Sequence, residues 1–179
     1  RRANLTDTDL SRTIVRNANL GEANLTRSNV EQTDFSGAEL VAAKFEKTKL
    51  ARADLRETDL RAKDLSGADL RNADLNRRDL TRTVLRGAYL AGANLEWANL
   101  GGVILKLSDL KDTQLLGANL QDADLSTARN LVEEQLGGAI VSGCKLPDQL
   151  EFKGLEIIQK LTAYSRKIFL AILLGCTYV

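Results

Sequence analysis

The sequence has no histidine and no methionine among its 179 residues, only one proline and only two cysteines. Histidine is the commonest general base and a frequent zinc ligand, so its absence excludes Ser-His and Cys-His catalytic pairs and most zinc sites. Cys144 and Cys176 form no metal-binding or redox motif. Aromatic residues make up 4% of the chain, which excludes a core of large rings. We therefore predict a protein that is not an enzyme, with no catalytic residue, cofactor or metal ion.

Neither sign of charge dominates the chain. Lysine and arginine number 25 and aspartate and glutamate number 24, so the net charge is +1. A protein that binds nucleic acid needs a basic surface, and one that binds single strands also needs aromatic rings for stacking. The sequence provides neither, and we predict no nucleic-acid partner.

Apolar residues recur at every fifth position from Leu5 to Leu125 without a break. Of these 25 positions, 21 are leucine, two are valine and two are phenylalanine. The residue directly before is Asp or Asn in 17 units. The residue two before is small in all units but three, which carry Lys63, Arg78 and Val103. A fixed internal period of this kind is typical of solenoids.

A period of five fits neither an α-helix, which places apolar residues three and four apart, nor a long strand, which alternates them. A short extended stretch followed by a corner fits better. The small residue and the leucine, two positions apart, then point inward, and the Asp or Asn between them points outward. Stacking such units would bury one continuous apolar column.

Residues 68–72 read Ala-Asp-Leu-Arg-Asn, a clean copy of a unit written A(D/N)LXX. This unit resembles that of the pentapeptide-repeat proteins, and the resemblance covers residues 1–128. It implies an all-β solenoid, a right-handed quadrilateral β-helix with four units per coil and about six coils. Residues 20 apart would stack on one wall, and Phe35 and Phe45 would lie on opposite walls.

Lys63 and Arg78 occupy positions that should face inward. Burying an unpaired charge is very costly, so the coils are expected to kink locally around residues 60–80. Either the long side chains extend outward past an opened corner, or they bind an anion or form an internal ion pair. The sequence leaves both interpretations open.

Five outward positions carry apolar or aromatic side chains, and we predict that they contribute to a protein interface: Val84, Tyr89, Trp97, Ile104 and Leu107. One branch of the family resembled here mimics duplex DNA with acidic columns and binds topoisomerases. Acidic residues do recur from Asp54 to Asp79, but arginines interleave with them. The DNA-mimicking function is therefore kept as an alternative.

The five-residue register stops after Leu125. Residues 129–150 are predicted to form a helical cap, because Asn130 suits a helix N-cap and two glycines follow at positions 137 and 138. An open β-helix end is an exposed edge that such a cap would cover. The segment also resembles the cap of many cyanobacterial pentapeptide-repeat proteins.

Residues 151–179 are predicted to be an amphipathic and then an apolar helix. Arg166 and Lys167 precede an apolar run over 168–179, as on the cytoplasmic side of a membrane helix. The run is shorter than the roughly 20 residues that cross a bilayer. It is interpreted as the start of a truncated transmembrane segment, in resemblance to cyanobacterial family members with a carboxy-terminal membrane segment. The alternative is a packed or partner-binding helix.

These patterns together predict a non-enzymatic scaffold that binds an unidentified protein partner. We expect membrane association through the carboxy-terminal segment, with the repeat domain in the cytoplasm. A soluble cytoplasmic scaffold that uses the carboxy-terminal helix to bind its partner is the alternative. The sequence does not indicate an oligomeric state.

Overall fold

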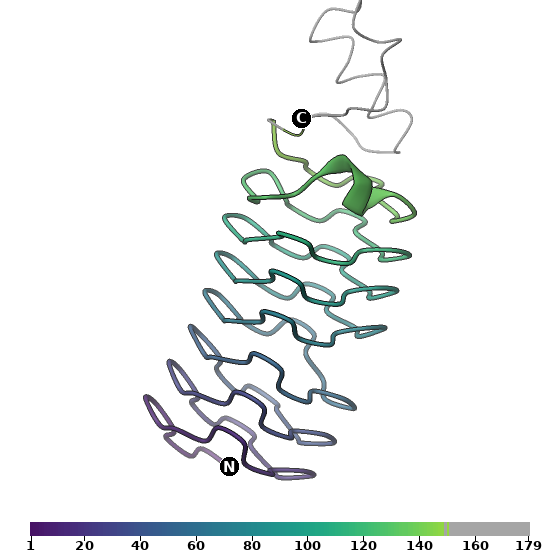
Figure 1. Ribbon diagram of the computed structural model, residues 1–179. Helices are drawn as coiled ribbons and strands as arrows, with labels where there is room; N and C mark the ends of the chain where they lie inside the picture. The colour runs from purple at the N-terminus through teal and green to yellow at the C-terminus, as the bar shows by residue number, and fades with distance from the viewer. Residues whose placement is uncertain (149, 151–179) are drawn as a thin grey trace, which may run out of the picture.

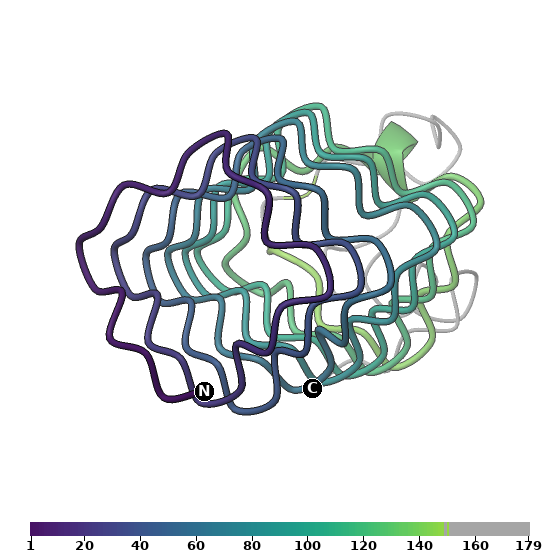
Figure 2. The same ribbon diagram turned by 90° about the horizontal axis from the view of Figure 1, so that it is seen from below.

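The chain winds into a four-sided tower, and the computed structural model describes residues 1–148 and 150. Figures 1 and 2 show the coils from the side and along the axis. β-Bridges join residues 20 apart, such as Asn4 with Asn24, so each coil holds four five-residue units. We number the walls by their first inward apolar residue, and each later residue 20 positions on lies on the same wall: Leu5 on wall 1, Leu10 on wall 2, Val15 on wall 3 and Leu20 on wall 4.

Most units pair with the coils above and below through their short extended stretches. The Leu85 N–H donates to the Ile104 carbonyl at 2.8 Å, and the Ile104 N–H donates back to the Thr83 carbonyl at 3.2 Å. The Ala88 N–H then closes a turn onto the Leu85 carbonyl at 3.1 Å. Gly87, in the third position of this turn, has a φ of +66°, as a type II turn requires. The same positive φ occurs at non-glycine corners such as Arg52 and Asn72.

The core is a continuous column of leucines with small residues beside them. Nearly all the inward leucines from Leu25 to Leu125 are almost fully buried. Phe35 and Phe45 lie on opposite walls, as predicted, and their ring centroids meet edge to face at 6.4 Å. Buried threonines at the small position donate to the carbonyls of leucines one coil below, as Thr48 does to Leu25 at 2.8 Å. The small slot thus tolerates a hydroxyl because a backbone acceptor lies within reach.

The predicted helical cap over 129–150 is not shown. Among the described residues the structure has one helix, the single-turn 3-10 helix η1 (Glu133–Leu136). The tower instead continues past it, with bridges from Asn119 to Ile140 and from Asp124 to Lys145. These pairs are 21 residues apart, so one extra residue enters this coil. The Gln135 side chain donates to the Leu110 and Thr113 carbonyls at 2.8 Å, which ties η1 to the coil below.

The predicted helices over 151–179 lie outside the described residues. Within residues 1–148 and 150, no helix has the length and apolar character needed to cross a membrane.

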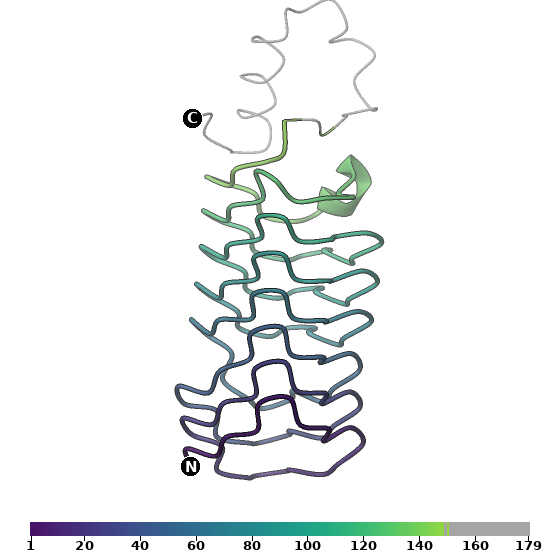
Figure 3. The ribbon, with the colours of Figure 1, turned by 90° about the vertical axis from the view of Figure 1, so that its left-hand side faces the viewer.

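The backbone ladder is interrupted once in the middle of the tower. Within the described chain, no bridge joins the unit of Leu40 to that of Leu60, or the unit of Leu60 to that of Leu80. Asp59 is consequently in no bridge at all. Figure 3 shows these coils spread apart on one side of the tower.

Candidate functional site

Four of the five predicted interface residues gather around one vertical corner of the tower. Val84 and Ile104 are stacked on wall 1 and joined by a bridge. Leu107 is at the corner that leads to wall 2, and Tyr89 is on wall 2. Ile104 is 39% exposed, Leu107 44% and Tyr89 48%, while Val84 is partly buried. We call these four residues the apolar strip.

The corner beneath the apolar strip carries a glycine. Gly87 lies one coil below Leu107, and a Cβ built on it would meet no atom within 4 Å. Arg86, beside it, is exposed. Gly87 therefore leaves open space below Leu107, and the exposed Arg86 borders this space.

Trp97 does not join the apolar strip. It lies at the corner between walls 3 and 4, diagonally opposite Leu107, and is 56% exposed. Its indole ring packs on Gly117 in the next coil, where a Cβ would clash with it. Leu116, which the sequence analysis did not single out, is exposed beside Gly117. The tower thus has a second, smaller apolar corner, which the five-residue numbering alone could have located.

The Asp and Asn residues before the leucines have a structural role that the sequence analysis missed. Each of them accepts a hydrogen bond through Oδ1 from the backbone N–H two residues on, as Asp74 does from Asn76 at 3.1 Å. This contact is an Asx-type turn, which favours Asp and Asn over longer side chains. Most of these residues are therefore part of the fold rather than a binding surface.

Three aspartates of the acidic run pair with arginines of their own units. Arg61 pairs with Asp59 at 2.9 Å, and Arg71 pairs with Asp69 at 2.6 Å. Arg56 pairs with Asp54 at 2.7 Å in the same way. The walls therefore present salt-linked pairs, each worth little in stability because it is exposed.

Two of these carboxyl groups have strongly lowered pKa values. The Ser36 hydroxyl and N–H and the Arg16 guanidinium lower the pKa of Asp34 to about 2. Arg61, which donates from both its side chain and its backbone, lowers the pKa of Asp59 to about 2, with a smaller contribution from Lys63. Both carboxylates thus stay ionised well below neutral pH.

The lowered pKa values make the fold sensitive to acid. A carboxyl whose pKa is lower in the folded chain stabilises it above the unfolded pKa of about 4, and this contribution is lost as the pH falls toward 2. We expect the urea midpoint to stay level from pH 7 to 5 and to fall between pH 4 and 2. Asp34→Asn keeps the Oδ1 acceptor for Ser36, so this variant should show a shallower fall. An unchanged slope would contradict the assignment to Asp34.

Lys63 and Arg78 occupy the small-residue positions of two units in one coil, and both are partly buried. Neither forms an ion pair with any carboxylate in the described chain. The backbone ladder beneath both residues is open: Asp64 has no bridge to Lys44, and Asp79 has none to Asp59. The expected irregularity therefore takes the form of an interrupted ladder.

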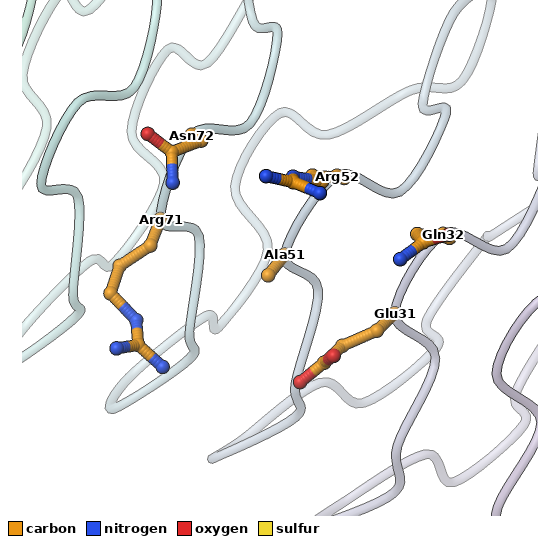
Figure 4. A pocket seen from close by; sticks show the side chains of 6 residues that line it. All are labelled: Glu31, Gln32, Ala51, Arg52, Arg71 and Asn72. Carbon is orange, nitrogen blue, oxygen red and sulfur yellow. The ribbon is translucent and has the colours of Figure 1, made fainter.

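We searched the described residues for a metal site and for a cavity lined by converging side chains. No three His, Cys, Asp or Glu side chains in residues 1–148 and 150 are arranged to hold a metal ion. A shallow hollow of about 230 Å³ opens at the corner between walls 2 and 3, lined by Glu31, Gln32, Ala51, Arg52, Arg71 and Asn72. Figure 4 shows these side chains in separate columns that do not converge on one point. Arg71 is also occupied by its pair with Asp69.

Comparison with known proteins identifies a repeat family. A family model described as pentapeptide repeats matches residues 3–40, 38–77, 68–106 and 88–126. No curated protein matches the chain. Among solved structures, Rfr23, a pentapeptide repeat protein from the cyanobacterium Cyanothece 51142, is 28% identical, over 72% of this chain and 86% of its own, with a TM-score of 0.39.

Two further solved structures are similar. HetL, a pentapeptide repeat protein involved in heterocyst differentiation regulation in the cyanobacterium Nostoc sp. strain PCC 7120, is 27% identical, over 82% of this chain and 79% of its own, with a TM-score of 0.25. A trypsin-treated form of QnrB1, a plasmid-mediated fluoroquinolone resistance protein, is 18% identical over 99% of both chains, with a TM-score of 0.47.

Proposed function

The chain belongs to the pentapeptide-repeat family, and on that basis we propose that it is a non-enzymatic scaffold that binds a protein partner through the apolar strip. Proteins of this family fold as right-handed quadrilateral β-helices and generally serve structural or interaction roles. A protein-binding role is therefore the general function, and the strip is the specific surface proposed for it.

The observation that carries the proposal is the grouping of exposed apolar side chains on consecutive coils. Val84 and Ile104 are stacked on one wall, and Leu107 and Tyr89 continue around the adjoining corner. Elsewhere these outward columns hold mostly polar or charged residues, such as Asp64 below Val84 and Asp124 above Ile104. Exposed apolar side chains that gather on one face are typical of protein-binding patches.

Mutation of the strip tests this function. Ile104→Arg should reduce capture of the partner from extracts of the source cells by about tenfold or more, since buried interface anchors commonly contribute over 1 kcal/mol. Gln114→Arg is the matched control, because Gln114 occupies the same position of its unit on the opposite wall and is exposed. Equal capture by both variants, or no saturable capture by the wild-type chain, would contradict the proposal.

Mimicry of duplex DNA, the alternative function, needs carboxylates that are free to face a partner. The pairing of Asp54, Asp59 and Asp69 with neighbouring arginines argues for the apolar strip instead. Membrane attachment and a partner-binding helix both fall on residues 151–179, outside the described chain, and both stay predictions from the sequence.

A further inference from the structure

The interruption of the ladder covers slightly more than one full coil. Four unit pairs lack both backbone hydrogen bonds within the described chain, namely those of Leu40 with Leu60, Phe45 with Leu65, Leu55 with Leu75 and Leu60 with Leu80. By contrast, each inward leucine from Leu65 to Leu110 donates its N–H to a carbonyl of the next coil, as Leu80 does to Asn99 at 2.8 Å. The loss is therefore local to one junction.

One wall stays closed at this junction. On wall 2, the Leu50 N–H donates to the Asp69 carbonyl at 2.8 Å, and the Asp69 N–H donates to the Thr48 carbonyl at 2.9 Å. At the adjoining corner, the Lys47 N–H donates to the Ser66 carbonyl at 2.8 Å. The hydrogen bonds that connect the two stacks of coils at this junction thus lie on wall 2 and at the corner before it.

The opposite wall is the most open. Wall 4 carries the unit of Thr58, Asp59 and Leu60, which lacks ladder hydrogen bonds both to the unit below and to the unit above, within the described chain. The ladder resumes only at the next corner, where the Ala62 N–H donates to the Thr81 carbonyl at 2.9 Å. A structure bonded along one wall and unbonded along the opposite one has the geometry of a hinge.

Side chains do not replace the missing backbone bonds on wall 4. Arg61 is paired with Asp59 of its own unit, and no ion pair of the described residues crosses from the coil of Leu40 to that of Leu60. Leu40 and Leu60 nevertheless remain 2% and 1% exposed. The apolar column therefore holds the junction together without fixing its backbone, since apolar contacts are non-directional.

The cause of the opening lies in the coil of residues 63–82. Lys63 on wall 1 and Arg78 on wall 4 fill inward slots that hold small residues in the adjacent coils: Ala43 and Thr83 below and above Lys63, and Thr58 and Ala98 below and above Arg78. Burying the Lys63 ammonium or the Arg78 guanidinium away from water in such a slot would be very costly. The coils therefore separate enough for these partly buried side chains to reach water.

We propose that this junction is a hinge, with wall 2 at Thr48–Leu50 as the pivot and wall 4 at Thr58–Leu60 as the side that opens. The two stacks of coils bend relative to each other about wall 2. The apolar strip lies above the hinge, on the carboxy-terminal stack, so bending changes the direction of the amino-terminal walls relative to a partner bound at the strip.

Hydrogen exchange of the full chain tests the hinge at residue level. The amides of Asp59 and Leu60 should exchange at least about a hundredfold faster than those of Asn99 and Leu100, which occupy the same wall two coils higher. The Leu50 amide should be as protected as that of Leu90. Equal protection of Leu60 and Leu100 would overturn the proposal, and so would an unprotected Leu50.

Distances between spin labels test the bending itself. In a cysteine-free background, labels at positions 41 and 81, at the corner that follows wall 4, should give a broader distance distribution than labels at 81 and 121, which span an uninterrupted ladder at the same corner. Combining Lys63→Ala with Arg78→Ala should narrow the first distribution and leave the second unchanged. The outward Arg77→Ala is the control. A 41–81 distribution as narrow as 81–121 in the parent chain would exclude the hinge.

Discussion

Replacing Leu105 with alanine is expected to lower the free energy of unfolding by about 3 kcal/mol, in the range seen for buried leucines. Leu105 is fully buried on wall 1 and stacks between Leu85 and Leu125. Its N–H is bonded to Asp124 at 2.8 Å, so the backbone cannot easily collapse into the space that the side chain leaves. Urea unfolding, followed by circular dichroism, measures the loss.

The neighbouring residue provides the control. Ile104→Ala removes a similar side chain from the outward face of the same unit, where Ile104 is 39% exposed. We expect a loss below about 1 kcal/mol there. Losses of equal size for the two variants would contradict the assignment of Leu105 to the core and Ile104 to the surface.

Ala98→Arg should have an even larger effect, a loss of at least about 3–4 kcal/mol. Ala98 lies directly above Arg78 on wall 4 and is 1% exposed, but its coil has a complete ladder. The new guanidinium would face the apolar column without a partner, so the ladder should open between the units of Leu80, Leu100 and Leu120. Urea unfolding and exchange of the Asn99 amide measure both consequences.

Ala91→Arg makes the same chemical change at an outward corner. Ala91 lies one coil above Arg71, so the equivalent position of the coil below already holds an arginine. This variant should stay within about 0.5 kcal/mol of the parent chain. If Ala98→Arg were equally neutral, the inward slot would accept a charge without cost, and the explanation given for the Lys63–Arg78 junction would fail.

The repeat itself could be predicted from the sequence because every unit obeys one rule. The twenty-residue stacking follows once four units form a coil, and so does the meeting of Phe35 and Phe45 across the core. The rule also placed Val84 and Ile104 on the same wall, one coil apart. Trp97 could have been separated from the strip by the same numbering, since it falls two units away from Leu107 around the coil.

The carboxy-terminal end of the tower was missed because one extra residue shifts the register. After Leu125 the buried leucine and valine side chains are those of Leu131, Leu136 and Val141, which are again five apart. The pattern resumes one position late, and Asn130 together with the glycines at positions 137 and 138 favoured a helix instead. A search that allowed a single insertion would have found this coil.

The extent of the open junction could not be read from the pattern. Lys63 and Arg78 indicate that two inward positions hold a charged residue in place of a small one. Which walls separate as a result depends on how the backbone of the whole coil relaxes. The bonded contact from Leu50 to Asp69 on wall 2 appears only in the three-dimensional arrangement. The Asx-type hydrogen bonds were missed for a different reason, since an outward Asp or Asn is also typical of a solvated surface.

The bridges between residues 20 apart have a consequence for how such a chain can change in length. Deleting a segment of 20 residues removes one coil and duplicating it adds one. In both cases every wall above the change keeps its orientation relative to the coils below. A change of five residues would also preserve the unit pattern, but it would turn everything above by a quarter revolution. The apolar strip would then lie above a different wall of the lower coils, although the contacts within its own coils would be unchanged.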